Sequence, residues 1–266
     1  LSMEKQIKTI GVLTSGGDAP GMNAAIRSVV RTALNRNIRV LGIRRGYSGL
    51  LARDMFEMNL RSVSDTLHRG GTILYSARCP EFRDDKGVER GKEVCLEMGI
   101  DGLVVIGGDG SFRGARDLSL KGIPCIGIPG TIDNDIASSD YTVGFDTAVN
   151  TVMDMVDKLR DTSQSHDRCS IVEVMGRRCG DIALHAGIAC GAVAILVPEV
   201  PFSIDSIIEK MQRTLRTGKK HFIIIVAEGV TSVGGVGTVH DIAEEIEART
   251  GVESRATVLG HVQRGG

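Results

Sequence analysis

The chain alternates between short apolar runs rich in β-branched residues and longer segments whose apolar residues recur at helical spacing. A short apolar run bounded by glycine or polar residues is typical of a strand buried in a parallel sheet. The predicted strands are Thr9–Thr14, Arg39–Ile43, Gly102–Ile106, Cys125–Ile128, Ser170–Met175, Ala194–Val197 and Phe222–Ala227. The predicted helices are Asn23–Leu34, Lys86–Met98, Phe112–Ser119, Ala148–Arg160, Ile204–Thr217 and Ile242–Arg249. This order of strands and helices indicates βαβ units, so the predicted fold class is α/β.

The chain has 266 residues, which is more than one compact domain usually contains. A compact domain holds about 150 residues, so two lobes are expected. Asp140–Asp146 separates two series of strands and helices, and we place the boundary there. Ligands of such sheets bind beyond the carboxyl ends of the strands. We therefore expect two doubly wound, mainly parallel-sheet lobes with the active site in the cleft between them. Leu1 and Ser2 precede Met3 and are interpreted as a cloning remnant.

Composition and charge exclude several classes of function. The formal net charge is -1, from 32 basic and 33 acidic residues, so no overall field attracts nucleic acid or anionic lipid. The chain has no Trp and 3% aromatic residues, which leaves few platforms for stacking bases. No apolar stretch approaches the roughly 20 residues that span a bilayer. We therefore expect no nucleic-acid or membrane partner.

The cysteines and histidines point to a reduced compartment and no transition metal. The 6 cysteines are scattered, without a C-x-x-C pair and without a secretory signal ahead of them, so we expect reduced thiols in the cytoplasm. The 6 histidines form no H-E-x-x-H motif and are not spaced with the cysteines as in a zinc site.

Glycine-rich turns follow two of the predicted strands and precede helices. Ser15–Gly21 reads Ser-Gly-Gly-Asp-Ala-Pro-Gly, and its small residues let backbone N–H groups face an anion at a helix N-terminus, with Gly17 closest. Gly107–Ser111 surrounds one carboxylate with glycines. Such a loop suits phosphate oxygens held by backbone amides while Asp109 meets a hard cation such as Mg²⁺. Considered singly, either segment could equally be an ordinary tight turn.

A third turn, Thr131–Asp135, carries two carboxylates two residues apart, on one side of an extended segment. Like charges so placed repel each other unless a cation or a proton uses them. A sugar hydroxyl that attacks phosphorus needs a carboxylate to accept its proton, and the transferred phosphoryl group needs metal and positive donors. An Asx-turn with a helix N-cap is the alternative interpretation. Because three such turns end three strands, we favour phosphoryl transfer.

A nicotinamide-dependent oxidoreductase is the competing enzyme class. Gly108, Gly110 and Gly114 follow a strand and precede a helix, but Arg113 stands where the dinucleotide fingerprint G-x-G-x-x-G has its third glycine. That hypothesis also gives no role to Thr131–Asp135.

Five segments together resemble the bacterial 6-phosphofructokinase family. They are Ser15–Asn23, Arg69–Thr72, Gly107–Ser111, Pro129–Asp135 and Gly260–Gly266. The resemblance runs from Ile7 to the last residue. It implies transfer of the γ-phosphoryl group of ATP to the 1-hydroxyl of fructose 6-phosphate, with Mg²⁺ as cofactor.

Carried over position by position, the resemblance implies distinct roles. Asp133 would accept the proton, Thr131 would contact the sugar and the transferred group, and Arg177 would stabilise charge in the transition state. Asp109 would engage Mg²⁺. The implied ATP-binding positions are Gly17, Arg78, Cys79, Gly108, Asp109, Gly110 and Ser111. The implied sugar-phosphate positions are Thr131, Ile132, Asp133, Arg168, Met175, Gly176, Arg177, Glu228, Arg255, His261, Val262, Gln263 and Arg264.

The resemblance also implies domains and assembly. Residues 1–144, with 258–266, would form the ATP and Mg²⁺ lobe, and residues 145–257 the sugar-phosphate lobe. Arg168 and Arg255 would reach into a neighbouring subunit's site, as in a homotetramer. The family continues past Gly266 through further helices, so a catalytically weak, nucleotide-binding regulatory form is a third hypothesis.

Donor and effector preferences follow from single positions. Pyrophosphate-dependent phosphofructokinases usually carry Asp and Lys where this chain has Gly110 and Gly130, so ATP is the predicted donor. The family's effector site, which accepts ADP and phosphoenolpyruvate, matches at Arg27, Arg31, Arg160, Lys219, Lys220 and His221. Val193 and Thr217 replace a usual glutamate and lysine, so a changed effector preference is expected.

Overall fold

The computed structural model describes residues 6–233 and 237–266, and the chain forms two compact units. The first unit runs to Thr131 and includes Ile136–Gly144 and Gly266. The second unit consists of Ile132–Asp135 and Phe145–Gly265.

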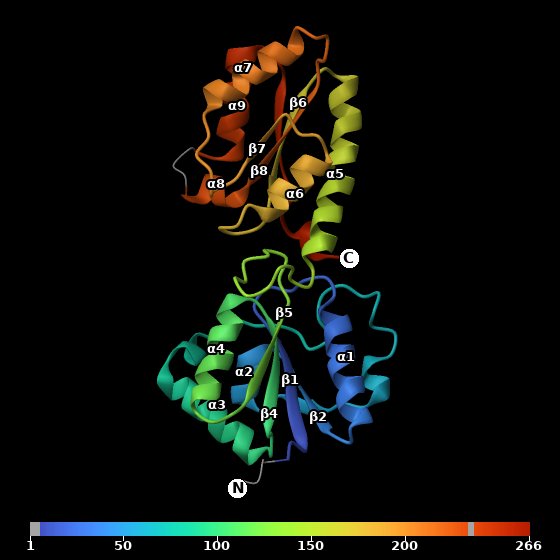
Figure 1. Cartoon of the computed structure of the whole chain (residues 1–266), viewed down its shortest axis with the longest axis vertical. Coiled ribbons are helices and arrows are strands. Elements are labelled where there is room, and N and C mark those ends of the chain that lie inside the picture. The colour runs from blue at the N-terminus through green and yellow to red at the C-terminus, as the bar shows by residue number, and fades with distance from the viewer. Residues whose placement is uncertain (1–5, 234–236) are drawn as a thin grey trace. The chain divides into compact units, whose positions relative to one another are not determined.

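The first unit is built on a five-stranded sheet with the order β3–β2–β1–β4–β5 (Figure 1). Its strands are β1 (Thr9–Ser15), β2 (Arg39–Ile43), β3 (Met55–Glu57), β4 (Gly102–Gly107) and β5 (Cys125–Pro129). All pair in parallel except β3, which is antiparallel to β2. The register sets Ser15 beside Gly107 and Gly107 beside Pro129, at the carboxyl ends of β1, β4 and β5. The glycine-rich turns therefore start from one edge of this sheet.

Helices cover both faces of the first sheet. They are α1 (Met22–Asn35), α2 (Gly46–Ala52), α3 (Asp85–Glu97) and α4 (Asp109–Leu120), with short 3₁₀ turns η1 (Leu60–Val63) and η2 (Pro80–Arg83) in the connections. Figure 1 shows α1 on one face and the other three helices on the opposite face. Leu13 and Val105 of the strands are fully buried in one core with Leu50, Val94 and Leu118 of those three helices. This packing fixes the edge from which the turns emerge.

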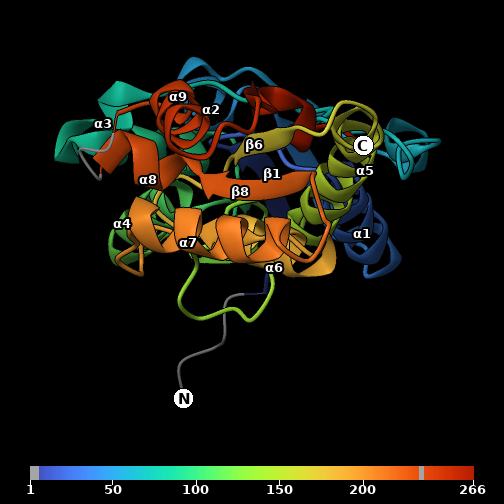
Figure 2. The same cartoon turned by 90° about the horizontal axis from the view of Figure 1, so that it is seen from above.

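The second unit contains a four-stranded, entirely parallel sheet with the order β7–β8–β6–β9. Its strands are β6 (Cys169–Val174), β7 (Ala194–Leu196), β8 (Phe222–Ala227) and β9 (Ser254–Val258). Its helices are α5 (Phe145–Ser165), α6 (Asp181–Ala189), α7 (Ile204–Leu215), α8 (Glu228–Val233), α9 (Val239–Thr250) and the 3₁₀ turn η3 (Gly260–Arg264). Figures 1 and 2 show α5 and α6 on one face of the sheet and α7, α8 and α9 on the other.

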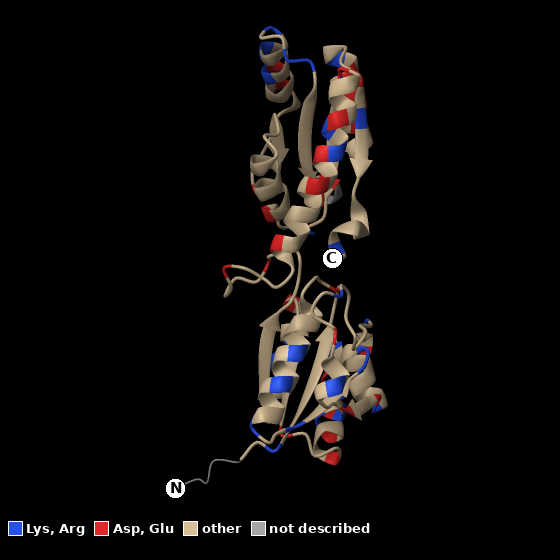
Figure 3. Ribbon diagram, turned by 90° about the vertical axis from the view of Figure 1, so that its right-hand side faces the viewer, with Lys and Arg blue, Asp and Glu red and all other residues tan. Residues whose placement is uncertain are grey.

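Charged residues lie mainly on the helices and connections, while the strands carry few of them (Figure 3). Every residue of β8 is buried, as expected for a strand covered on both faces. Among the described residues, no helix combines the length and the apolar character needed to cross a bilayer.

The predicted α/β class with mainly parallel sheets is confirmed, and every predicted strand and helix is present with ends shifted by a few residues. The prediction missed β3, β9, α2, α6 and α8. β9 reads Ser-Arg-Ala-Thr-Val at a sheet edge, so it lacks an apolar run. α2 contains Gly46 and Gly49, which lower helix propensity. α6 is apolar on all sides and shows no helical periodicity.

The predicted domains differ from the structure at two places. Residues 258–265 belong to the second unit, whereas the prediction put them in the first lobe. β9 leads into η3, whose turn packs on α5, and Gln263 accepts a hydrogen bond from the backbone N–H of Met175 at 3.1 Å. Ile132–Asp135 also belongs to the second unit. The expected cleft and the assignment of one ligand to each lobe stay predictions.

Candidate active site

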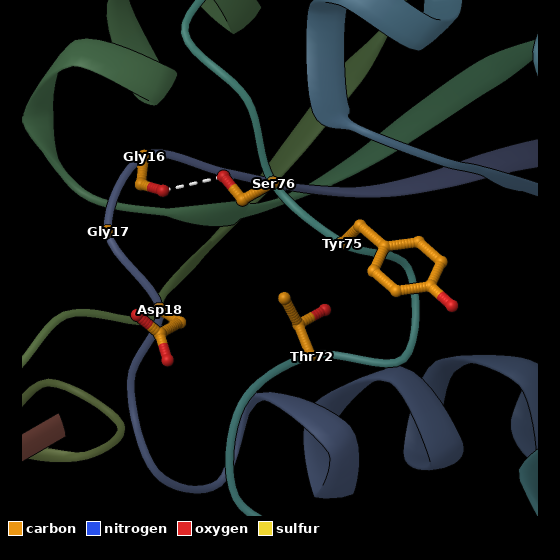
Figure 4. Close-up of a pocket in the computed structure, with 6 residues that line it drawn as sticks. All are labelled: Gly16, Gly17, Asp18, Thr72, Tyr75 and Ser76. Carbon is orange, nitrogen blue, oxygen red and sulfur yellow. Dashed lines mark hydrogen bonds between the residues drawn. The ribbon is translucent and has the colours of Figure 1, made fainter. Parts of the chain in front are cut away.

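The turn after β1 forms one wall of an open hollow of about 340 Å³ in the first unit. Gly16 and Gly21 have φ angles of 87° and 88°, so the chain reverses through conformations that favour glycine before α1 begins. The hollow is lined by Gly16, Gly17, Asp18, Thr72, Tyr75 and Ser76 (Figure 4). Gly17 is exposed there, which leaves its backbone accessible to a ligand.

The turn after β4 lies against the turn after β1. A Cβ at Gly107 would come within 2.4 Å of the Ser15 carbonyl oxygen, so only glycine allows this approach. Gly108 is the N-cap of α4, and Asp109 and Gly110 are the first, exposed residues of that helix. Ser111 is buried, and its carbonyl accepts a hydrogen bond of 2.6 Å from the Tyr47 hydroxyl. Predicted ATP-site positions therefore meet at one edge of the first sheet.

Asp109 fits the predicted Mg²⁺ role as a single carboxylate at a helix start. Its side chain is 51% exposed and pairs with Arg113 at 2.9 Å. In the described part of the chain, no three His, Cys, Asp or Glu side chains gather as a metal-binding cluster. Mg²⁺ in kinases keeps waters and binds through one or two carboxylates and substrate phosphates, so one accessible carboxylate suffices.

Thr131 is the residue at which the chain first leaves the first unit, next to the turn after β4. It is buried, and its carbonyl accepts a 2.5 Å hydrogen bond from the Thr142 hydroxyl. A Cβ at Gly108 would lie 3.6 Å from that of Thr131, so the predicted substrate contact borders the predicted ATP site. The next residue, Ile132, is fully buried in the second unit.

Asp133 is an ionisable residue in a buried position, with 4% of its surface exposed. Burial, as the larger cause, and the neighbouring Asp135 carboxylate together raise the pKa of its carboxyl from 3.8 to about 6. The cationic Arg264 and Arg177 oppose the rise. A carboxyl that changes charge near pH 6 can accept a proton at neutral pH and return it to water afterwards.

Asn134 and Asp135, the two residues after Asp133, each contact a charged side chain of the second unit. The Arg177 guanidinium lies 3.8 Å from the Asp135 carboxylate, and its side chain is 65% exposed. The Asn134 amide donates a hydrogen bond of 2.8 Å to the carboxylate of Asp181 at the start of α6. Asn134 and Arg177 both have positive φ, at 52° and 56°, as in tight turns. Cationic and acidic groups thus face each other around Asp133.

The turn after β6 is held by two side chains. Glu228, at the start of α8, accepts hydrogen bonds from the backbone N–H groups of Gly176 at 3.1 Å and Arg177 at 2.7 Å. The fully buried Gln263 accepts the N–H of Met175 at 3.1 Å. These predicted sugar-phosphate positions lie together at the carboxyl ends of β6 and β8.

Arg168 and Arg255 do not join that group within the chain. Arg168 precedes β6 and pairs with Glu253 at 2.8 Å. Arg255, in β9, pairs with the same carboxylate. The pair lies at the amino ends of these strands, opposite Met175.

The remaining predicted ligands lie on exposed segments. Arg78 is exposed, and Cys79 precedes η2 and packs against the first core. His261 and Val262 are exposed on η3, and Arg264 follows them.

The predicted effector positions are divided between the units. Arg27 and Arg31 lie on α1, where Arg27 donates a 2.7 Å hydrogen bond to the Val63 carbonyl. In the second unit, Arg160 donates to the Cys190 carbonyl. Lys219, Lys220 and His221 precede β8, and Lys220 lies 3.7 Å from Asp167. Val193 is buried, whereas Thr217 is exposed.

Several polar residues around these turns were not predicted. Thr72 and Ser76 line the hollow, Thr14 and Asn23 hydrogen-bond the segment that forms one of its walls, and Asp181 binds Asn134. Asn23 and Thr72 stand inside the motifs that carry the resemblance, so their position in the sequence was a signal. Thr14 is a polar residue at the end of an apolar strand, which is a weaker signal.

The geometry agrees with comparisons to known proteins. A family model described as phosphofructokinase matches residues 9–266. An ATP-dependent 6-phosphofructokinase of Finegoldia magna is 59% identical over 260 residues, which cover 98% of this chain and 80% of the relative. A phosphofructokinase structure from Saccharomyces cerevisiae has a TM-score of 0.89 at 39% identity, over 97% of this chain and 39% of that longer one. A pyrophosphate-dependent phosphofructokinase from Marinobacter aquaeolei has a TM-score of 0.84 at 25% identity, over 97% of this chain and 69% of that one. Because the family model matches from β1 to the last residue, the chain belongs to the phosphofructokinase family.

Proposed function

We propose that this chain transfers the γ-phosphoryl group of ATP to the 1-hydroxyl of fructose 6-phosphate, giving fructose 1,6-bisphosphate and ADP in glycolysis. Family membership and the 59% identity to a relative named ATP-dependent 6-phosphofructokinase support this reaction. The same findings argue against the nicotinamide-dependent alternative.

The buried carboxyl of Asp133 is the observation that best supports the chemistry. The sugar hydroxyl oxygen bonds to the γ-phosphorus, and the bond from that phosphorus to the β–γ bridging oxygen breaks. The hydroxyl proton passes to Asp133. A pKa of about 6 leaves this group a carboxylate at neutral pH and keeps it basic enough to take the proton.

Positive groups near Asp133 are available to the phosphoryl oxygens. Arg177 is exposed, and its guanidinium lies 3.8 Å from the Asp135 carboxylate in a long ion pair, so it can turn to an incoming phosphoryl group. Glu228 accepts hydrogen bonds from the backbone N–H groups of Gly176 and Arg177, and this fixes the backbone position from which the Arg177 side chain extends. Mg²⁺, held by Asp109 and the ATP phosphates, would neutralise negative charge on the β- and γ-phosphate oxygens.

The choice of ATP over pyrophosphate depends on Gly110 and Gly130. A Cβ at Gly110 would meet nothing within 4 Å, so packing does not require glycine there. A Cβ at Gly130 would lie 3.0 Å from Ile106 and 3.4 Å from Met22, so packing accounts for that glycine. The open space at Gly110 supports a role in ligand access.

Assembly and control are proposed on the same basis. A homotetramer would give Arg168 and Arg255 a function, because within one chain they lie away from Met175 and Gly176. The cationic effector positions, Arg27, Arg31, Arg160, Lys219, Lys220 and His221, would bind an anionic regulator such as ADP or phosphoenolpyruvate. We place the enzyme in the cytoplasm.

The reaction is tested by following ADP release with and without fructose 6-phosphate. Release should depend on the sugar phosphate. Asp133→Asn should lower kcat by about 10²- to 10⁴-fold, the usual contribution of a general base. Asp154→Asn, at an exposed position on α5, is the matched control and should turn over as the wild type does. Sugar-independent release, or full activity of Asp133→Asn, would contradict the proposal.

A further inference from the structure

Two chain segments far apart in sequence form the hollow in the first unit. One wall is the turn Gly16–Asp18 after β1, and the other is the segment Thr72–Ser76 (Figure 4). Their separation sets the width of the space available to a ligand. Each wall is a loop without helix or strand structure, so the distance between the walls depends on the side-chain contacts that hold them.

Thr14 holds the second wall from inside the first sheet. Its fully buried hydroxyl donates a hydrogen bond to the Tyr75 carbonyl at 2.9 Å and lies 2.8 Å from the Thr72 hydroxyl. Because the Thr14 hydroxyl has one proton, Thr72 must be the donor in the contact between the two threonines. One side chain of β1 therefore satisfies two groups of the opposite wall.

Asn23 and Ser76 add contacts from either side. Asn23 follows the turn on α1 and is 1% exposed. Its amide donates to the Arg69 carbonyl at 2.8 Å, and its oxygen accepts the Ile73 N–H at 2.7 Å. The Ser76 hydroxyl donates to the Gly16 carbonyl at 2.5 Å, which joins the two walls directly (Figure 4).

The conformation of Tyr75 indicates that these contacts impose the shape of the wall. Its φ angle is 57°, a left-handed conformation that is unfavourable for a bulky residue. Such a conformation persists where surrounding contacts over-determine it. The Tyr75 carbonyl is held by Thr14, its N–H donates to the Thr72 carbonyl at 3.1 Å, and the preceding Leu74 carbonyl accepts from the Arg45 N–H at 2.8 Å.

We propose that Thr14, Asn23 and Ser76, here called the brace, are positioning residues for nucleotide binding. The brace keeps the Thr72–Ser76 wall at a fixed distance from Gly16–Asp18, so that the hollow admits the nucleotide, and sets the path of the chain to Arg78. The inference rests on the proposed function, because Gly17 and Arg78 are assigned to the ATP site. None of the three residues needs to touch the sugar phosphate.

The test compares ADP binding and steady-state kinetics for variants that differ by one hydroxyl. Thr14→Val keeps the shape of the side chain and removes both hydrogen bonds, whereas Thr14→Ser keeps the hydroxyl. Thr9→Val makes the same substitution at the other end of β1. Ser76→Ala, at a half-buried position, is the second variant and carries the test alone if Thr14→Val loses the cooperative unfolding of the wild type.

Thr14→Val and Ser76→Ala should each raise the Kd for ADP and the KM for ATP roughly 3- to 10-fold, as expected for lost hydrogen bonds in the wall. The KM for fructose 6-phosphate should stay within about twofold, and Thr14→Ser and Thr9→Val should bind ADP as the wild type does. Unchanged ADP affinity in Ser76→Ala and in folded Thr14→Val overturns the brace, as does an equal rise in both KM values. If either result overturns the brace, the proposed function still holds as long as the wild type binds ADP and releases ADP only when fructose 6-phosphate is present. A wild type that binds no ADP overturns both.

Discussion

The raised pKa of Asp133 leads to a quantitative prediction for the dependence of activity on pH. The reaction requires the carboxylate form, and the pKa of this buried group is about 6. About 90% of the chains would carry that carboxylate at pH 7, but only about 10% at pH 5, since each pH unit changes the ratio tenfold. With the ordinary value of 3.8, more than 90% would still be ionised at pH 5. Burial therefore predicts a loss of activity of roughly tenfold over a range in which an exposed aspartate would cause almost none.

The assay is kcat/KM for fructose 6-phosphate between pH 4.5 and about 8, at saturating ATP, because this parameter reports ionisations of the nucleotide-bound enzyme and of the free sugar phosphate, of which only the former differs between variants. Removal of one neighbouring charge supplies an internal check. The Asp135 carboxylate raises the pKa of Asp133, so Asp135→Asn should lower that pKa and move the acid limb of the profile to lower pH. The direction follows because loss of a like charge favours the ionised form, and because Arg177 is released from its 3.8 Å ion pair.

A profile that stays flat down to pH 5 in the wild type would refute the assignment of a buried base with a raised pKa. An acid limb that moves to higher pH in Asp135→Asn would refute the electrostatic explanation. Unfolding at low pH is separated from titration by returning each sample to pH 7.5 and measuring the recovered activity.

Three further predictions follow from individual contacts. Asp133→Asn should stabilise the fold by up to about 3 kcal/mol at pH 7 and by almost nothing below pH 4. Because the pKa of Asp133 is raised, the folded chain binds a proton on this carboxyl more tightly than the unfolded chain does, and the wild type loses that stabilisation as the pH rises from 3.8 to about 6. Urea unfolding at both pH values measures the difference, and equal stabilisation at both would contradict the prediction. Gly110→Asp should reduce turnover with ATP at least about tenfold. The melting temperature should stay within about 2 °C, since an acidic residue near a helix N-terminus is favourable and no atom lies within 4 Å of the added Cβ. Gly110→Ala is the control for bulk without charge, and unchanged ATP kinetics in Gly110→Asp would contradict the prediction. Glu228→Ala should raise the KM for fructose 6-phosphate at least about tenfold, because the backbone N–H groups of Gly176 and Arg177 lose a charged acceptor. Glu228→Gln, which keeps a neutral acceptor, should raise this KM less. Equal KM values for the two variants would exclude this explanation.

The buried strands could be predicted from the sequence because apolar content alone identifies them. β8 reads Phe-Ile-Ile-Ile-Val-Ala and every residue is buried, so pattern and structure coincide. β3 and β9 could not be recognised, because short edge strands bury little and their sequences are correspondingly polar. α6 was missed for the opposite reason, since a helix that is apolar all round shows no periodicity.

The candidate site was predictable as far as its turns. Gly107 and the Ser15–Gly21 turn belong together because parallel strands end at one edge, and the sequence already contained that argument. The difference between Asp133 and Asp135 was not predictable from spacing. The structure buries the first to 4% exposure, which raises its pKa, and leaves the second beside Arg177.

The brace was beyond the reach of sequence reasoning for another reason. Thr14 and Tyr75 are joined by a contact between residues 61 positions apart, and no periodicity encodes such a contact. The left-handed Tyr75 likewise carries no signal, because tyrosine is not a residue that favours this conformation.

The central claim is that the chain moves the γ-phosphoryl group of ATP to the sugar and not to water. The most direct measurement is ³¹P NMR of a reaction that contains the protein, MgATP and fructose 6-phosphate. The account predicts one new phosphomonoester signal, on carbon 1 of the sugar, that grows in equal amount with ADP and grows about 10²- to 10⁴-fold more slowly with Asp133→Asn. Appearance of inorganic phosphate instead of the sugar bisphosphate, or no phosphoryl transfer by the folded wild-type protein, would contradict it.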